Sequence, residues 1–227
     1  MKKILSIALC GLLVFTSCSS MSNLAKGALI GTGAGAAVGA GVGALIGGEK
    51  GAAIGAAIGT AVGAGAGSII GDVMDRKAEE LKELENANVE TITDANGLTA
   101  IKVTFDSGIL FDFNKSNLSA DAQANLKKFA EEMKDLEDTN ITIWGHTDNV
   151  GTEAANQSVS QKRADAVSKN LQTNGIAKSR ITAEGKSFTM PVADNETEAG
   201  RAQNRRVEVY ISANEKMIAD AEAQAAK

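Results

Sequence analysis

A glycine stands at every fourth position of one long apolar segment, residues 27–71. The residues between these glycines are mostly Ala, Val, Ile and Leu, and the only charges are Glu49 and Lys50. In a helix this period forms one slowly drifting stripe, the repeated GxxxG pattern that lets helices approach closely in lipid. The positions in register are Gly27, Gly31, Gly35, Gly39, Gly43, Gly47, Gly51, Gly55, Gly59, Gly63, Gly67 and Gly71.

The charged pair divides this segment into two apolar halves. Each half has about 20 residues, and at 1.5 Å per residue it reaches about 30 Å, the thickness of a bilayer core. The segment contains 16 glycines, which cost a lone helix in water on the order of 16 kcal/mol relative to alanine. We therefore predict a packed or membrane-associated glycine-zipper helical hairpin. A flexible linker is the alternative, but linkers are Ser-rich and aperiodic. Self-association into homo-oligomers is a separate hypothesis.

The first 17 residues have the pattern of a secretory signal peptide. Lys2 and Lys3 form a basic start, and residues 4–15 form an apolar run that is too short to span a bilayer as a helix. Cleavage after residue 17 would remove two lysines and no acid, so the formal net charge would change from −5 to −7. An acidic chain of this kind is not expected to bind nucleic acid.

Cys18 follows the apolar run directly, after a small residue, which resembles a bacterial lipobox. Residues 18–26 would then be a lipidated N-terminus with a short linker, held in the membrane by its acyl chains. Ser19, rather than an aspartate, follows the cysteine, and by resemblance to lipoprotein sorting this favours the periplasmic face of the outer membrane. The alternative is an ordinary signal peptide in which the cysteine has no role. Both cysteines of the chain lie in this segment, so no disulfide is expected further on.

The remainder of the chain has the composition of an α/β domain. Residues 72–88 are predicted to be a helical spacer, residues 89–213 a domain and residues 214–227 a frayed helical tail. The predicted class is α+β, a two-layer α/β sandwich. Apolar periodicity, a Ser119 helix cap and turn residues place its strands at 89–93, 98–105, 141–145, 180–185 and 206–212, and its long helices at 120–136 and 153–174.

Arg163 stands out in the second long helix. It lies on the apolar stripe of that helix, spaced by fours and eights from Val159, Val167 and Leu171. A core-facing arginine is costly unless a carboxylate meets it, and Asp148, in the glycine-bounded loop before the helix, is the nearest candidate. A carboxylate and a guanidinium near one helix start suit a zwitterionic ligand.

Four ordered motifs resemble those of OmpA-like C-terminal domains. The resemblance covers about residues 101–212 and implies a β-α-β-α-β-β fold that binds bacterial peptidoglycan. Lipobox, glycine zipper and this domain together resemble outer-membrane lipoproteins of the YiaD type. The motifs are Phe111-Asp-Phe-Asn-Lys-Ser116, Gly145-His-Thr-Asp148, Asn156 with Arg163-Ala164, and Asn195 with Gly200-Arg201 and Asn204-Arg-Arg-Val-Glu208.

In this family the ligand is the diaminopimelate of the peptidoglycan stem peptide, whose side chain ends in an ammonium and a carboxylate. The resemblance implies that Asp148 takes the ammonium and Arg163 the carboxylate. Carried over by position, Asn114, Asn156 and Arg205 would line the pocket, and Thr147, Asn149 and Asn204 would shape it. Strand alternation allows only one of Arg205 and Arg206 to face it.

The sequence departs from the family pattern at Ala155, and at Ser187 and Phe188. Taken singly, the site residues have simpler explanations: Asp148 as a turn residue and Arg163 as a member of a structural ion pair. The single histidine, His146, has no partner for a metal site and is predicted to be structural.

We expect a lipid-anchored, non-enzymatic protein without a cofactor that tethers the outer membrane to the cell wall. No Ser/His/Asp or Cys/His constellation supports catalysis. The alternative is a membrane-active or oligomeric glycine-zipper assembly in which the domain is only an anchor. A motility stator subunit is not expected. It would need one transmembrane helix with a proton-carrying acid, whereas the only acid in the predicted hairpin is Glu49, at its tip.

Overall fold

The computed structural model describes residues 62–111 and 115–227. The predicted lipidation site Cys18, the predicted ligand residue Asn114 and all but the end of the glycine segment lie outside this part of the chain. The elements in chain order are α3 (Ala64–Leu81), β1 (Ala87–Thr93), β2 (Thr99–Asp106), α4 (Ser107–Leu110), α5 (Ala120–Glu132), β3 (Thr139–Gly145), α6 (Glu153–Thr173), the 3₁₀ turn η1 (Lys178–Arg180), β4 (Ile181–Gly185), α7 (Glu198–Asn204), β5 (Arg206–Ala213) and α8 (Glu215–Ala225).

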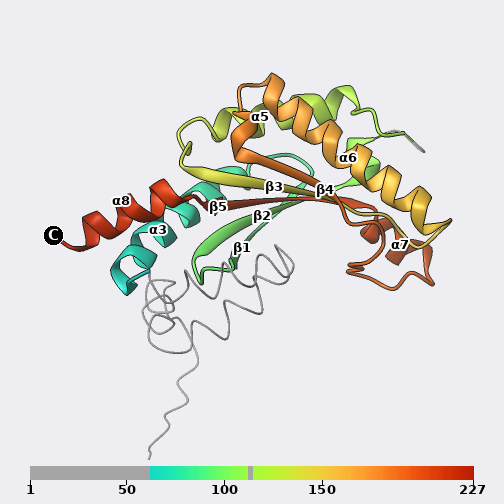
Figure 1. The fold of residues 1–227 in the computed structure, drawn as a ribbon. Helices are drawn as coiled ribbons and strands as arrows, with labels where there is room; N and C mark the ends of the chain where they lie inside the picture. The colour runs from blue at the N-terminus through green and yellow to red at the C-terminus, as the bar shows by residue number, and fades with distance from the viewer. Residues whose placement is uncertain (1–61, 112–114) are drawn as a thin grey trace, which may run out of the picture.

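The strands form one sheet in the order β1-β2-β5-β3-β4. Only β3 and β4 are parallel, and α6 makes the crossover between them, while the neighbouring pairs are antiparallel. The last strand, β5, lies in the centre of the sheet, between β2 and β3. Helices α5 and α6 lie side by side across the sheet (Figure 1). The α+β class and the two-layer arrangement predicted from the sequence are confirmed.

One face of the sheet carries the apolar core. Val103 pairs with Val209, and Val209 pairs in turn with Ile143, so all three point to the same face. These residues have no exposed surface and share one apolar cluster with Leu126 of α5 and Leu171 of α6. Burial of each such side chain contributes about 1.5–3 kcal/mol to folding. The alternation of these strands therefore fixes which face the helices cover.

Helix α3 belongs to this core and corrects the predicted domain boundary. It begins at Ala64, inside the glycine segment, and continues through residue 71 without a break. Ile70, Met74 and Leu81 are fully buried and join the apolar cluster of the domain. Residues 72–88 were predicted to be a helical spacer, but the helical part of this region packs into the domain core. No helix among the described residues is both long and apolar enough to cross a membrane.

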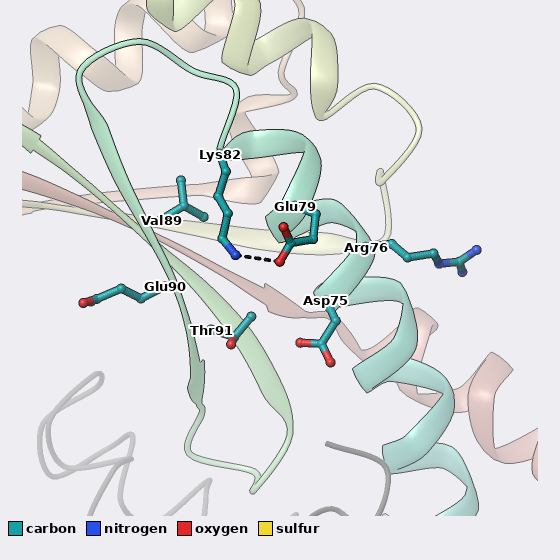
Figure 2. A pocket seen from close by; sticks show the side chains of 7 residues that line it. All are labelled: Asp75, Arg76, Glu79, Lys82, Val89, Glu90 and Thr91. Atoms are coloured by element: carbon teal, nitrogen blue, oxygen red, sulfur yellow. Dashed lines mark hydrogen bonds and ion pairs between the residues drawn. The ribbon is translucent and has the colours of Figure 1, made fainter. Parts of the chain in front are cut away.

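The contact between α3 and β1 leaves a cleft of about 490 Å³ (Figure 2). Glu79 of the helix and Lys82, directly after its end, form an ion pair of 2.6 Å at the rim of the cleft, and the apolar Val89 of the strand lies beside Lys82 (Figure 2). Arg76 and Glu90 also line the cleft, and their side chains extend in opposite directions (Figure 2). The rim of the cleft on the helix side thus carries side chains of both positive and negative charge.

The C-terminal helix α8 packs against α3 and is not a frayed tail. Ala221 is buried, and Asn214 caps the helix by accepting a hydrogen bond from the N–H of Met217 at 2.9 Å. A Cβ atom on Gly65 would lie only 2.9 Å from the Cβ of Ala225. The glycine therefore allows the two helices to approach closely.

The short helix α7 was missed and read as part of a polar loop. Thr197 caps it, accepting a hydrogen bond from the N–H of Gly200 at 3.1 Å. A Cβ atom at Gly200 would lie 1.9 Å from the carbonyl oxygen of Asp194, so only glycine fits this close contact. Helix α7 ends directly before Arg205 and thereby places this residue.

Candidate ligand-binding site

Two glycines bring α6 directly onto the ends of β3 and β4. A Cβ atom on Gly145 would lie 2.2 Å from the carbonyl oxygen of Ser160, and one on Gly185 would lie 2.4 Å from the backbone nitrogen of Gln161. Because β3 ends under the helix, the chain must turn sharply through residues 146–152 to enter α6. This turn carries the aspartate singled out from the sequence.

The turn is held by short-range hydrogen bonds. Asp148 Oδ1 accepts from the N–H of Val150 at 3.0 Å, and Gly151 adopts a φ of 99°. Asn156, on the first turns of α6, donates from Nδ2 to the carbonyl oxygen of Val150 at 3.0 Å. Thr152 caps the helix. The amide of Asn156 thus fixes the shape of the loop beside Asp148.

Asp148 pairs with Arg205. Arg205 Nη1 donates to Asp148 Oδ2 at 2.7 Å, and Nη2 donates to Glu198 Oε1 of α7 at 2.9 Å. The hydrogen bond with Asp148 is the main reason that the pKa of Arg205 lies above its ordinary value. Asp148 is 9% exposed, so its ion pair with Arg205 is partly shielded from water.

Arg163 lies close to this pair but does not contact it directly. Within the described part of the chain no carboxylate lies within 4.0 Å of its guanidinium, and its buried Nε has no hydrogen-bond partner. Burial lowers the pKa of Arg163, the charge of Arg205 lowers it further, and Asp148 opposes both effects. The direct contact with Asp148 considered from the sequence is therefore not formed.

The guanidinium of Arg163 instead lies over an aromatic ring. Its Cζ is 5.3 Å from the ring centroid of Phe111, and the residue is 8% exposed. A cation–π contact offsets only part of the cost of burying a charge. The site therefore contains a positive charge that lacks an anionic partner among the described residues.

Two buried hydroxyl groups on the segments that carry the site also lack partners among the described residues. Thr147 Oγ1, next to Asp148, and Ser107 Oγ form no hydrogen bond there, although both residues are nearly inaccessible. Ser107 donates its N–H to the carbonyl oxygen of Arg205 at 2.9 Å, which places α4 against the ion pair. Ser107 was not predicted from the sequence; its one local signal is its position two residues after the predicted strand 98–105 and four residues before Phe111.

The other predicted site residues have different surroundings. Asn204 is fully buried, and its side-chain amide forms hydrogen bonds with the loop ahead of α7. Its Oδ1 accepts from the N–H groups of Val192 and Ala193. Its Nδ2 donates to the carbonyl oxygen of Ala193 and to Oδ1 of Asn195. Its role is to shape the loop. Asn149 is exposed.

Two side chains lie away from the site. Arg206 points to the opposite side of the chain from Arg205 and binds Glu208 Oε1 at 2.9 Å, as strand alternation predicted. Val159 is 37% exposed, so the buried stripe of α6 does not include it, contrary to expectation.

His146 is a buried structural residue, as predicted. Its Nε2 lies 3.2 Å from Glu208 Oε2, and burial is the main cause that lowers its pKa. The described residues contain no group of histidine, cysteine and carboxylate side chains suited to a metal ion.

Comparison with known families agrees with this fold: residues 110–205 match the OmpA family. Residues 1–75 match the YMGG-like Gly-zipper family. The chain therefore carries an OmpA-family domain preceded by a glycine-zipper segment, and the described part of that segment ends in α3.

Known relatives match about half of this chain. Outer membrane porin F of Pseudomonas fluorescens is 46% identical over 113 residues, 50% of this chain and 34% of that protein. The probable lipoprotein YiaD of Escherichia coli is 35% identical over 112 residues, 49% of this chain and 51% of that protein. The chain thus aligns with only a third to a half of these relatives.

A solved structure shows the same fold. The structure described as the cell wall anchor of the T6SS from Pseudomonas aeruginosa superposes with a TM-score of 0.51 at 31% identity, covering 62% of this chain and 97% of that one.

Proposed function

We propose that this protein is an outer-membrane lipoprotein whose C-terminal domain binds peptidoglycan noncovalently. Acyl chains on Cys18 would hold the N-terminus in the outer membrane, and the domain would face the periplasm. The names of its relatives, an outer membrane porin and a lipoprotein, support the location and describe no enzymes. The similarity in fold to a structure described as a cell wall anchor supports peptidoglycan as the ligand.

We propose further that the ligand group is the diaminopimelate of the stem peptide. The observation that carries this proposal is the buried guanidinium of Arg163, which has no anionic partner among the described residues. A ligand carboxylate would supply that partner through charge-assisted hydrogen bonds. The ligand ammonium would bind the carboxylate of Asp148, which has acceptor capacity beyond its bonds to Val150 and Arg205.

A pull-down with purified sacculi tests the proposal on the full-length protein in detergent. Asp148→Ala and Arg163→Ala should each reduce the bound fraction at least tenfold, since each removes one charged contact to the ligand. Lys162→Ala is the matched control, because Lys162 is exposed and adjacent to Arg163 in the same helix. Undiminished binding by both site variants would exclude this site.

A second binding experiment uses peptidoglycan with a different stem peptide. Lysine-type peptidoglycan retains the side-chain ammonium but lacks the terminal carboxylate of diaminopimelate. Binding should be much weaker, and Arg163→Ala should have little further effect. Equal binding of both wall types would argue against diaminopimelate recognition while leaving peptidoglycan binding intact.

A glycine-zipper assembly is the second candidate, favoured by the family match of residues 1–75. In that case the domain would only anchor a membrane-active or oligomeric N-terminal segment. Crosslinking in detergent tests this candidate, and a strictly monomeric protein would exclude oligomer formation.

A further inference from the structure

A buried carboxylate lies on the side of β5 opposite the apolar core. Glu208 is 4% exposed and accepts three hydrogen bonds. Its Oε1 accepts from Arg206 Nε at 2.9 Å, and its Oε2 accepts from the hydroxyl of Tyr210 at 2.7 Å and lies 3.2 Å from His146 Nε2. A buried charge with this many donors is held in a single geometry.

Two of these three donors are sequence neighbours of the charged pair of the site. His146 precedes Asp148 by two residues, and Arg206 directly follows Arg205. The backbone joins the same two segments, because the N–H of His146 donates to the carbonyl oxygen of Arg206 at 2.9 Å. One carboxylate therefore holds the chain on both sides of the 2.7 Å contact between Asp148 and Arg205.

The network also reaches the long loop before α7. Arg206 Nη2 donates to the carbonyl oxygen of Met190 at 3.0 Å, and Arg206 Nη1 donates to that of Asn204 at 3.3 Å. Although burial raises the pKa of Glu208, the hydrogen bond from His146 and the positive charge of Arg206 outweigh it and hold the pKa at about 2. The carboxylate thus keeps its charge at any physiological pH.

We propose that Glu208 is a positioning residue for the ligand-binding site. From the opposite side of the strand it fixes His146 and Arg206, and through them it sets the relative placement of Asp148 and Arg205. This inference rests on the proposed function, in which that pair binds the ligand. Supporting groups behind the contacting residues commonly set the geometry of a site in this way.

The test compares Glu208→Gln with Tyr210→Phe in the full-length protein in detergent. The first change removes the charge that binds both site segments. The second removes one hydrogen bond to the same carboxylate from a residue that does not adjoin the site. His146→Gln serves as a second site-side variant, should Glu208→Gln fail to fold.

The first measurement needs no ligand. In amide NMR spectra the resonance of Val150, whose N–H donates to Asp148, should shift in Glu208→Gln and His146→Gln and stay in place in Tyr210→Phe. Unchanged Val150 resonances in both site-side variants would overturn the proposal.

The second measurement is binding of a soluble diaminopimelate-containing stem peptide. Glu208→Gln and His146→Gln should weaken binding at least tenfold, and Tyr210→Phe less than twofold. If the wild type binds and all three variants lose affinity in proportion to their thermal stability, Glu208 has only a general structural role. If the wild type does not bind, the proposed function fails, while the Val150 shift still decides whether Glu208 positions the loop.

Discussion

Arg205 Nη1 donates to Asp148 Oδ2 at 2.7 Å, which joins two segments 57 residues apart in the sequence. The pair holds the loop before α6 against the start of β5. It also satisfies the charge of Asp148, so that the nearby Arg163 is the group left without an anion in the described residues. A ligand ammonium must therefore share Asp148 with Arg205, whereas a ligand carboxylate meets no competitor.

Replacement of Arg163 by methionine should stabilise the unliganded domain. The change removes a buried charge that has no ion-pair partner in the described chain and retains an unbranched side chain beside Phe111. We expect a gain of roughly 1 kcal/mol in the free energy of unfolding, together with loss of peptidoglycan binding. Urea denaturation measures the first effect and the sacculus pull-down the second. A destabilised variant would mean that Arg163 has a structural partner.

Gly145→Ala should destabilise the domain by about 3 kcal/mol or more, because the new Cβ would lie 2.2 Å from the carbonyl oxygen of Ser160. Gly67→Ala is the matched control. A Cβ there meets only Leu98 at 3.9 Å, an ordinary contact, and alanine favours a helix by up to about 1 kcal/mol. In thermal unfolding, the midpoint temperature should fall for Gly145→Ala and rise for Gly67→Ala, relative to wild type. Equal effects would refute the close contact of α6 with β3.

Asn204→Ala should release the loop before α7. The substitution leaves the N–H groups of Val192 and Ala193 without their acceptor, at a cost of about 1–3 kcal/mol for each group that stays buried and unpaired. Hydrogen exchange should accelerate at these two amides and remain slow in β3. Unchanged protection would show that the amide does not hold the loop.

The ionisation of the buried Asp94 should make the free energy of unfolding depend on pH. Burial raises the pKa of Asp94 to about 6, although its carboxylate accepts hydrogen bonds from Leu98 and Asn96. The folded state then binds the proton more tightly than the unfolded state. This contribution therefore favours folding below about pH 4 and is lost as the pH rises through 6.

Asp94→Asn removes this ionisation and keeps the acceptor oxygen. Relative to wild type, its free energy of unfolding should increase between pH 4 and pH 7, by up to about 3 kcal/mol. Denaturant titrations of both proteins at several pH values measure the difference. A difference that does not change with pH would contradict the raised pKa.

The long elements of the domain were predictable because their signals are local. Helix α6 has an apolar period and ends at Thr173, two residues before Gly175, whose φ is 102°. Helix α7 was missed because seven residues are too short for a period and its sequence is polar. The first residues of α3 were predicted to be helical as the end of the glycine-zipper hairpin, but their packing into the domain was not predicted. Glycine-rich sequence is a poor helix former in isolation, and the burial of Ile70 and Met74 that compensates for it leaves no local signal.

The sequence indicated which residues belong to the site better than it indicated which of them contact one another. The pattern around Arg163 indicated a buried cation, and the helix indeed buries it. The partner of Asp148 could not be read from the sequence, because Arg205 reaches it only through the central position of β5 and the missed helix α7. Ser107 could not be predicted for the same reason, since its hydrogen bond with Arg205 continues the pairing of β2 with β5, two neighbouring strands that are far apart in the sequence.

The continuity of α3 has a mechanical consequence. The last glycines of the zipper and the core residues Ile70, Met74 and Leu81 lie on one unbroken helix. Tension applied at the N-terminal end of α3 would therefore enter the folded domain along this helix, which has no break between Ala64 and Leu81. Such a load would shear α3 lengthwise past the β1–β2 hairpin and α8, so the packing of these three side chains would set the force that the domain withstands if it serves as the proposed tether.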